Sequence, residues 1–249
     1  MESRFSRTEM LIGPKGIKVL GDSTVAVFGL GGVGSYAVEA LARAGVGGLI
    51  LVDFDIVSIS NINRQLHALD DTVGLAKVEL MAGRVLKINP SVVVSSHRDK
   101  YRPGDGEKFL KDRPDYVVDA IDDMEAKVDL ITYCLKEGLP IVSSMGTGNK
   151  LDPTLFRVDD ISKTSVCPMA RSVRSRLKKE GIGSGLKVVF STEEPRKTNV
   201  VRDETGRKVP ASISFVPPVA GMILAGVVVR DLCQRRAGDQ NTLTTTFCK

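Results

Sequence analysis

Cysteine is scarce in this sequence, and none of it is paired. Cys134, Cys167, Cys233 and Cys248 lie far apart, and no Cys-x-x-Cys motif occurs. Zinc ribbons and disulfide-rich scaffolds need cysteines in close or regularly spaced pairs, so both are disfavoured. We therefore expect reduced thiols, as in a cytoplasmic protein.

Long apolar runs are also missing. Residues 1–4 lead into polar sequence, so we expect no secretory signal. The most apolar C-terminal run, residues 216–229, is interrupted by Pro217 and Pro218 and falls short of the about 20 residues that a membrane span needs. We interpret this run as a buried helix rather than a membrane-associated segment, and membrane binding is not expected.

What is present is the composition of a globular protein with a modest positive charge. The chain has 249 residues, of which 42% are hydrophobic, enough for one large domain with or without an appendage. The formal charge of +5 is compatible with a polyanionic partner but is too small to establish one.

Short apolar runs alternate with helical patterns in the first part of the chain. The strand-like runs are residues 24–28, 49–52, 92–94, 116–118 and 140–143, and the helical patterns are residues 35–44, 73–88 and 125–136. Strands that alternate with helices predict an α/β fold with a doubly wound, Rossmann-like and mostly parallel sheet.

The pattern changes after Gly148, so we expect a main fold over residues 1–148 and a C-terminal appendage over residues 149–249. The elements expected in the appendage are strands at residues 156–158 and 186–191, a basic helix at residues 169–179 and the buried C-terminal helix. Residues 193–210 are charged and have few large apolar side chains, so we expect a mobile loop there.

A glycine cluster joins the first predicted strand to the first helix. Gly29, Gly31, Gly32 and Gly34 allow a tight turn in which phosphate oxygens approach backbone N–H groups at the helix N-terminus. Asp53 ends the second strand, a position from which a carboxylate accepts hydrogen bonds from ribose hydroxyls. These features favour a nucleotide over a purely structural turn, but a nicotinamide-dependent dehydrogenase would show both.

The segment after Asp53 favours a triphosphate. Arg64 and Lys77 supply cations beyond the carboxyl edge of the sheet, and Asp122, after the fourth strand, has a carboxylate suited to Mg²⁺. A dehydrogenase has no use for these charges. The other polar residues expected at this nucleotide site are Asp55, Asn61, Gln65 and Asp123.

The chain contains, in order, the glycine turn, Asp-x-Asp-x-Val, Ser-Asn-x-x-Arg-Gln, a following lysine and an Asp-Asp pair. This constellation resembles the ubiquitin-activating-enzyme-like adenylyltransferases over about residues 4–148, which the resemblance identifies as the ATP-binding fold. It implies that Arg64 and Lys77 contact ATP phosphates, that Asp122 positions magnesium, and that Arg7 reaches the partner's site in a homodimer. From the residues alone, a solvated N-terminal helix is the alternative for Arg7.

The second half of the chain distinguishes between branches of these adenylyltransferases. Activators of sulfur carriers have two Cys-x-x-Cys zinc pairs there, and this chain has neither. Instead, four segments resemble the tRNA threonylcarbamoyladenosine dehydratase branch, namely residues 145–153, 158–164, 167–174 and 186–195. With these segments the resemblance extends to about Leu232.

That branch implies an ATP-dependent dehydratase that adenylates the threonyl carboxylate of the modified tRNA nucleoside and cyclises it. A nitrogen of the substrate's carbamoyl group can attack the activated carboxyl group, so no catalytic cysteine is required. Cys167 is therefore either a structural thiol or, with a depressed pKa at a helix start, a nucleophile, and the sequence leaves both open.

Positive charge is concentrated in the appendage. Residues 168–210 carry eleven Lys and Arg against five Asp and Glu, an excess of six, whereas the whole chain carries +5. Arg171, Arg174 and Lys178 fall on one face of the predicted helix, where phosphates of tRNA would meet them. A merely solvated basic helix is the alternative.

Three other functions remain as alternatives: an adenylyltransferase for a ubiquitin-like sulfur-carrier protein, a nucleotide-binding dehydrogenase, and a non-catalytic binding module. The missing zinc pairs disfavour the first, the phosphate-binding cations disfavour the second, and a binding module would be expected to lose some of these charged residues. DNA is not an expected partner. The sequence leaves open which tRNAs bind, whether a sulfur-transfer partner protein takes part, and whether a monovalent cation is bound.

Overall fold

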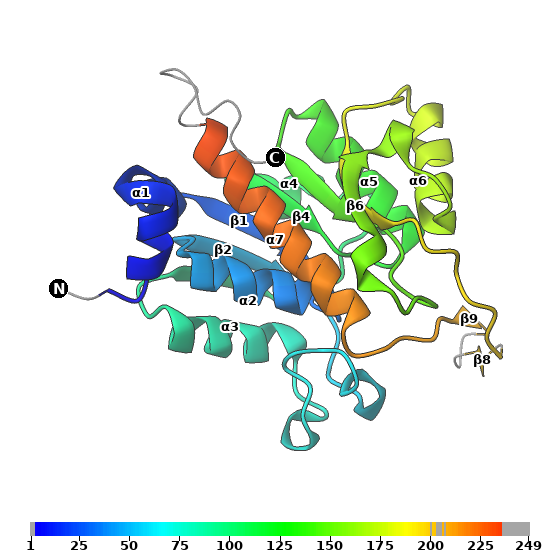
Figure 1. Cartoon of the computed structure of the whole chain (residues 1–249), viewed down its shortest axis with the longest axis horizontal. Coiled ribbons are helices and arrows are strands. Elements are labelled where there is room, and N and C mark those ends of the chain that lie inside the picture. Colours follow the sequence, from blue (N-terminus) through cyan, green and yellow to red (C-terminus); the bar gives the residue numbers. More distant parts are fainter. Residues whose placement is uncertain (1–2, 200, 203–205, 207, 236–249) are drawn as a thin grey trace.

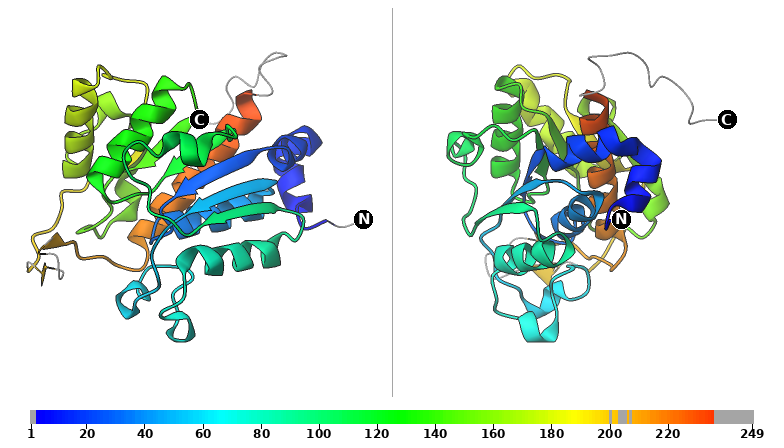
Figure 2. Two further views of the ribbon diagram at one scale, coloured as in Figure 1. Left: turned by 180° about the vertical axis from the view of Figure 1, so that it is seen from behind. Right: turned by 90° about the vertical axis from the view of Figure 1, so that its left-hand side faces the viewer.

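The computed structural model describes residues 3–199, 201–202, 206 and 208–235. Its centre is a seven-stranded sheet with helices packed on both faces, so the fold has three layers (Figure 1, Figure 2). The α/β fold with a Rossmann-like sheet, predicted from the alternation of strands and helices, is confirmed.

The sheet is parallel apart from one edge strand. In spatial order its strands are β3 (Val93–His97), β2 (Gly48–Val52), β1 (Thr24–Phe28), β4 (Tyr116–Asp119), β5 (Ile141–Ser144), β7 (Lys187–Ser191) and β6 (Phe156–Asp160). The edge strand β6 is antiparallel to β7. The strand order reverses between β1 and β4, and ligands bind beyond the carboxyl ends of the strands at such a switch point.

Helices cover the two faces of the sheet. One face carries α2 (Gly34–Ala44), α3 (Lys77–Ile88) and α7 (Val216–Arg235), with α1 (Ser6–Gly21) beside α7; the other carries α4 (Gly106–Leu110), α5 (Met124–Lys136) and α6 (Pro168–Lys179). Alternate side chains of a strand enter the two cores: Val25 and Val27 face one side, and Ala26 and Phe28 face the other. The near-continuous apolar runs of the sequence therefore correspond to strands buried on both faces.

The apolar C-terminal run is a helix of the core, as expected. Among the described residues, Val216–Gln234 of α7 is long and apolar enough to cross a membrane, with a mean hydropathy of 1.6, but 56% of it is buried in the fold. Gly221 allows α7 to approach α2 closely, because a Cβ there would lie 2.2 Å from the Val33 carbonyl oxygen. Most apolar side chains of α7 thus pack within the protein, whereas Met222 is exposed.

Two predicted elements are displaced in the structure. The helix expected over residues 73–88 begins at Lys77, because Gly74 has a φ of 87° and Ala76 is extended and bridges to Ile56. The third strand covers residues 93–97 instead of 92–94, since these five residues pair with β2. Lys77 consequently stands at the first position of α3. Two helices, α1 and α4, lie where the sequence pattern predicted no packed helix.

The segment after Gly148 shares the central sheet. β7 lies between β5 and β6, and α7 packs against α2. The 3-10 helices η3 (Pro153–Leu155) and η4 (Ile161–Lys163) connect this part, and β8 (Val201–Arg202) pairs with β9 (Lys208–Val209) in a separate hairpin. The division at residue 148 stays a prediction. We expected residues 193–210 to form a mobile loop, and part of this range lies outside the described residues. Cys248 also lies outside them.

Candidate active site

The glycine turn lies at the carboxyl edge of the sheet, between β1 and α2 and against the β4–α5 turn. Gly29 has a φ of 84°, and a Cβ there would lie 2.7 Å from the Ala120 carbonyl oxygen. A Cβ at Gly34 would lie 1.8 Å from the Gly29 carbonyl oxygen. Both positions therefore require glycine. Around Gly31 the nearest atom to such a Cβ is Gln65 Nε2, at 3.9 Å, so the backbone there remains approachable.

Asp53 connects the end of β2 to the glycine turn. Its Oδ2 accepts a 2.6 Å hydrogen bond from the Leu30 N–H, and its Oδ1 accepts a 2.8 Å bond from the Asp55 N–H. Burial raises the pKa of Asp53, and the positive charge of Lys77 opposes that rise. These bonds fix the direction of the carboxylate, and each oxygen keeps acceptor capacity for a ribose hydroxyl.

Lys77 and Asp55 form an ion pair next to Asp53. Lys77 Nζ lies 2.8 Å from Asp55 Oδ2, and the Lys77 side chain is only 6% exposed whereas that of Asp55 is 46% exposed. The Lys77 N–H also donates to the Asp55 carbonyl oxygen over 3.1 Å. An ammonium has three donors, so the geometry allows Lys77 to serve a phosphate oxygen as well as its carboxylate partner.

Arg64 follows η1 (Ile59–Asn61) in the segment between β2 and α3. Its Nη1 donates to the Ser60 carbonyl oxygen over 2.9 Å and to Asn63 Oδ1 over 2.7 Å. Burial lowers the pKa of Arg64, and the charge of Asp122 opposes this change. The electrostatic interaction with Asp122 shows that the residues after β2 and after β4 face the same space, as the sequence predicted.

Two polar residues of the same segment have mainly local contacts. Asn61 Oδ1 accepts a 3.1 Å hydrogen bond from the Ser58 N–H and so caps η1. Gln65 is buried, and its Oε1 has no hydrogen-bond partner. A Cβ at Gly32 would lie 3.1 Å from Arg64 Cγ, so this segment packs directly over the glycine turn.

Asp122 and Asp123 occupy the β4–α5 turn in different ways. Asp122 is exposed, whereas Asp123 Oδ1 caps α5 by accepting from the N–H groups of Glu125 and Ala126. Among the described residues, no group of three or more His, Cys, Asp or Glu could hold a metal ion by itself. A single carboxylate beside a phosphate site is nevertheless a donor set that fits Mg²⁺, which usually takes one or two carboxylates together with substrate phosphates and water.

His67, in the segment between β2 and α3, is a residue that the sequence did not assign to the site. It is buried, both ring nitrogens lack hydrogen-bond partners, and burial together with the charge of Lys77 lowers its pKa to about 4. The imidazole is therefore neutral at physiological pH. The sequence feature that could have indicated His67 is its position two residues after Gln65. A lone histidine, however, has no partner at a recognisable spacing.

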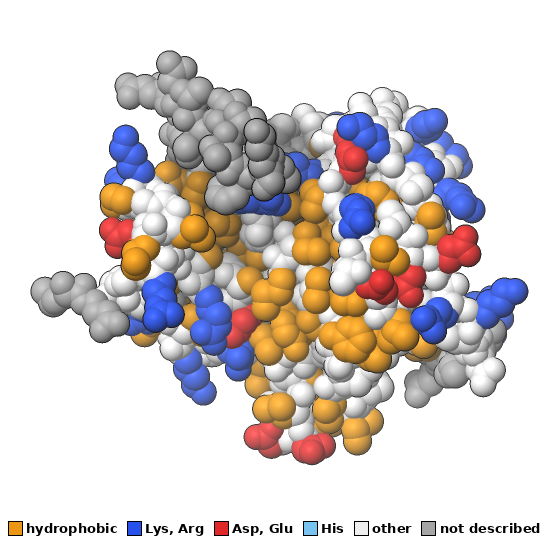
Figure 3. All heavy atoms as spheres, in the orientation of Figure 1, with side chains coloured by type: hydrophobic (Ala, Val, Ile, Leu, Met, Phe, Trp, Pro, Cys, Tyr) orange, Lys and Arg blue, Asp and Glu red, His pale blue; other side chains and the backbone are white. Residues whose placement is uncertain are grey.

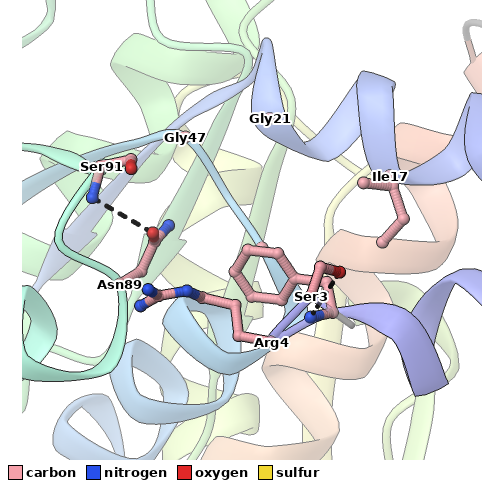
Figure 4. Close-up of a pocket in the computed structure, with 9 residues that line it drawn as sticks. Ser3, Arg4, Ile17, Gly21, Gly47, Asn89 and Ser91 are labelled. Atoms are coloured by element: carbon pink, nitrogen blue, oxygen red, sulfur yellow. Dashed lines mark hydrogen bonds between the residues drawn. The ribbon is translucent and has the colours of Figure 1, made fainter. Parts of the chain in front are cut away.

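Arg7 does not lie with the other predicted site residues in this chain. It is exposed on α1, which leads into the amino end of β1 and so belongs to the opposite edge of the sheet (Figure 1). A cavity of about 490 Å³ opens at that edge, where Arg4 extends towards Asn89 and donates to the Ile88 carbonyl oxygen over 2.7 Å (Figure 4). This cavity is remote from the glycine turn, so it is not the predicted nucleotide site.

The basic helix forms as predicted, but the three residues expected to meet RNA differ in exposure. Arg171 and Lys178 are exposed, whereas Arg174 is half-buried and its Nη1 donates to the Thr164 carbonyl oxygen over 2.9 Å. Figure 3 shows Lys and Arg side chains gathered on the side of the molecule where α6 lies. Arg174 therefore anchors the turn before α6 with at least part of its guanidinium group.

Cys167 is buried and stands at the N-cap position of α6. A Cβ at Gly146 would lie 3.9 Å from its Sγ, so the start of α6 packs against the segment that follows β5. The other described cysteines, Cys134 and Cys233, are free thiols, and burial raises the pKa of both. The expectation of reduced thiols is consistent with these positions.

Comparison with known proteins yields a family match over nearly the whole chain. The model of the ThiF family matches residues 5–248. The chain is 48% identical to the tRNA threonylcarbamoyladenosine dehydratase of Bacillus subtilis over 245 residues, which cover 93% of this chain and 95% of that protein. It is also similar to the crystal structures of the Escherichia coli dehydratase with ATP and with AMP, with TM-scores of 0.87 and 0.86 and 37% identity in both cases. The first comparison covers 96% of both chains, and the second covers 95% of this chain and 96% of that one.

Proposed function

Since this chain belongs to the ThiF family, we propose how its residues carry out the reaction of that family's tRNA-modifying branch. The chain is an ATP-dependent tRNA threonylcarbamoyladenosine dehydratase. The observation that carries this conclusion is the near full-length identity to a dehydratase, together with the same fold as a dehydratase that binds ATP. We infer a cytoplasmic enzyme, in keeping with a tRNA substrate.

The reaction removes one water from the nucleoside at the expense of ATP. In the proposed sequence, an oxygen of the threonyl carboxylate bonds to the α-phosphorus of ATP, and pyrophosphate leaves. A carbamoyl nitrogen then bonds to the carboxyl carbon and loses its proton, and AMP departs with the carboxylate oxygen. Both reacting groups belong to one nucleoside, so ring closure is intramolecular and needs no enzyme thiol.

Lys77 and Arg64 are proposed to hold the phosphates. Both side chains are at least partly withdrawn from water, so their charges act on a bound anion more strongly than exposed charges would. Gly29 and Gly34 support the same role, because they keep the turn tight where backbone N–H groups meet phosphate oxygens. Asp53 is proposed to bind the ribose.

Asp122 is proposed to hold Mg²⁺. Its carboxylate is exposed and lies within electrostatic reach of Arg64, which is itself proposed to hold the phosphates. When bound, Mg²⁺ neutralises charge on phosphate oxygens and so makes the α-phosphorus a better electrophile. Asp123 is proposed to contribute through its cap on α5, which fixes the end of the turn.

We propose a homodimer in which Arg7 completes the partner's site. Within one chain, α1 lies at the sheet edge opposite the glycine turn, yet it exposes Met10 and Leu11 almost fully. Exposed apolar residues also lie between β2 and α3, namely Phe54, Ile56, Ile59, Leu69, Val73 and Leu75. Figure 3 shows hydrophobic side chains gathered at the lower centre of that view. Apolar surface of this kind is typical of protein–protein interfaces.

Arg171 and Lys178 are proposed to contact tRNA phosphates. Both are exposed on α6, and the start of that helix packs against the segment after β5, at the carboxyl edge of the sheet. A basic helix at this edge directs the attraction for tRNA phosphates to the side of the sheet where the glycine turn lies.

The assignment is tested by the release of pyrophosphate and of AMP from ATP with three substrates. They are tRNA that carries threonylcarbamoyladenosine, the same tRNA without that modification, and a ubiquitin-like sulfur-carrier protein. We expect AMP and a nucleoside lighter by one water with the modified tRNA alone. Pyrophosphate release with the carrier protein but not with the modified tRNA would transfer the assignment to sulfur-carrier activation.

A further inference from the structure

A buried ion pair lies directly behind the Asp122 turn. Lys127 of α5 and Asp119, the last residue of β4, are both 0% exposed, with Nζ 2.6 Å from Oδ2. Lys127 Nζ also donates to the Ser144 carbonyl oxygen over 3.0 Å and to Ser143 Oγ over 3.3 Å. The Ser143 hydroxyl in turn donates to Asp119 Oδ2. All three ammonium protons therefore have acceptors, and the network is closed to water.

The other oxygen of Asp119 acts on the turn itself. Asp119 Oδ1 accepts a 3.0 Å hydrogen bond from the Ile121 N–H. On its N-terminal side the turn is held by the Ala120 N–H, which donates to the Phe28 carbonyl oxygen over 2.8 Å, and on its C-terminal side by the cap that Asp123 forms on α5. Asp122 lies between these fixed points.

Stability alone does not account for such a pair. Moving two charges out of water costs several kcal/mol each in real proteins, roughly what their attraction returns, and well-packed apolar residues often replace a buried pair without loss. What apolar residues do not supply is a carboxylate oxygen in a fixed direction. In this network that oxygen is Oδ1 of Asp119, and its partner is one residue from Asp122.

We propose that the Asp119–Lys127 pair is a positioning device for the metal-binding carboxylate. The lysine holds Asp119 in place, Asp119 fixes the Ile121 N–H, and the turn then presents Asp122 to the Mg²⁺-bound phosphates. This inference rests on the proposed role of Asp122. Groups that orient the ligands of a metal typically change its affinity by roughly 10- to 100-fold when they are removed.

Two double variants separate positioning from stability. Asp119→Leu with Lys127→Met removes both charges and the bond to Ile121. Asp119→Asn with Lys127→Met also removes both charges, but the amide oxygen can still accept from the Ile121 N–H, and the amide N–H₂ can donate to Ser143 or Ser144. The second variant is therefore a matched control that differs from the first in the turn bond.

The readout is the linkage between Mg²⁺ and nucleotide binding, which does not depend on turnover. The affinity for a non-hydrolysable ATP analogue is measured by calorimetry over a Mg²⁺ titration, and thermal unfolding is recorded without Mg²⁺. We expect the half-saturating Mg²⁺ concentration to rise about ten-fold or more in the leucine-bearing variant and to stay within about two-fold of wild type in the asparagine-bearing variant. The affinity without Mg²⁺ should be similar in both.

Two results would overturn the proposal: a wild-type Mg²⁺ requirement in a folded leucine-bearing variant, or equal shifts in both variants. If the leucine-bearing variant does not fold, Asp119→Ala with Lys127→Met takes its place against the same control. Asp122→Asn is measured in parallel. An unchanged Mg²⁺ requirement there refutes the proposed metal role of Asp122, whereas a shift there without one in the leucine-bearing variant refutes only the positioning role.

Discussion

Replacement of Lys77 by methionine should abolish adenylation and leave the fold almost unchanged. Methionine keeps an apolar stem in the buried first turn of α3 and removes the ammonium. The partner left behind, Asp55, is 46% exposed, so water can solvate its carboxylate. Loss of the ion pair should therefore cost only about 0–1 kcal/mol of the free energy of unfolding, as for other partly exposed pairs.

The effect on catalysis should be far larger. A buried ammonium aimed at the phosphates stabilises negative charge where it accumulates, and loss of one such contact typically lowers the rate by about 10²- to 10³-fold, or ~2.7–4 kcal/mol. The assay is AMP release with modified tRNA at saturating ATP. Thermal unfolding of the same preparation is recorded alongside.

Asp55→Asn is the matched control because it breaks the same ion pair from the other side. It leaves a 6%-exposed ammonium without its carboxylate, and an unsatisfied buried charged group costs about 1–3 kcal/mol or more. This variant should lose more stability than Lys77→Met and less activity. Wild-type turnover in a folded Lys77→Met enzyme would refute the phosphate-contact role.

Three further predictions test other parts of the molecule. Heterodimers of Arg7→Ala and Lys77→Met subunits should recover about one competent site in two, and inactivity of verified heterodimers would contradict donation in trans. Arg171→Ala with Lys178→Ala should weaken tRNA binding, reduce the slope of log affinity against log salt by about 1.5, and spare ATP affinity; an unchanged slope would remove α6 from the RNA interface. The pKa of His67 is lowered to about 4 in the folded chain. Between about pH 6.5 and 4, the imidazole is therefore protonated in the unfolded chain but stays neutral in the folded chain. The free energy of unfolding should fall between about pH 6.5 and 4, by at most about 3 kcal/mol, and urea titrations at several pH values should show a flatter dependence for His67→Gln.

The sheet could be predicted because its strands are buried on both faces. Residues 24–28 form an apolar run with a glycine cluster after it, and burial on two sides leaves few other structures for such a run. The start of α3 was predicted wrongly because apolar residues before it are exposed instead of buried. Val73 and Leu75 suggest an apolar helical face, but both are exposed, and Gly74 adopts a left-handed conformation that ends any helical pattern there.

Residues proposed to contact the ligand are easier to predict from the sequence than residues that orient those contact residues. Gly29, Asp53 and Asp122 follow strand ends in chain order, so the rule that ligands bind at the carboxyl edge of a parallel sheet brings them together. Lys127 is one polar residue in an amphipathic helix, a pattern that predicts a solvated side chain. Its burial is tolerated because acceptors arrive from β4 and from β5, up to 17 residues away in the chain. The burial of Lys127 can therefore be recognised only once the strands are packed side by side. The turn that holds Asp122 depends on this buried lysine as well as on its own residues.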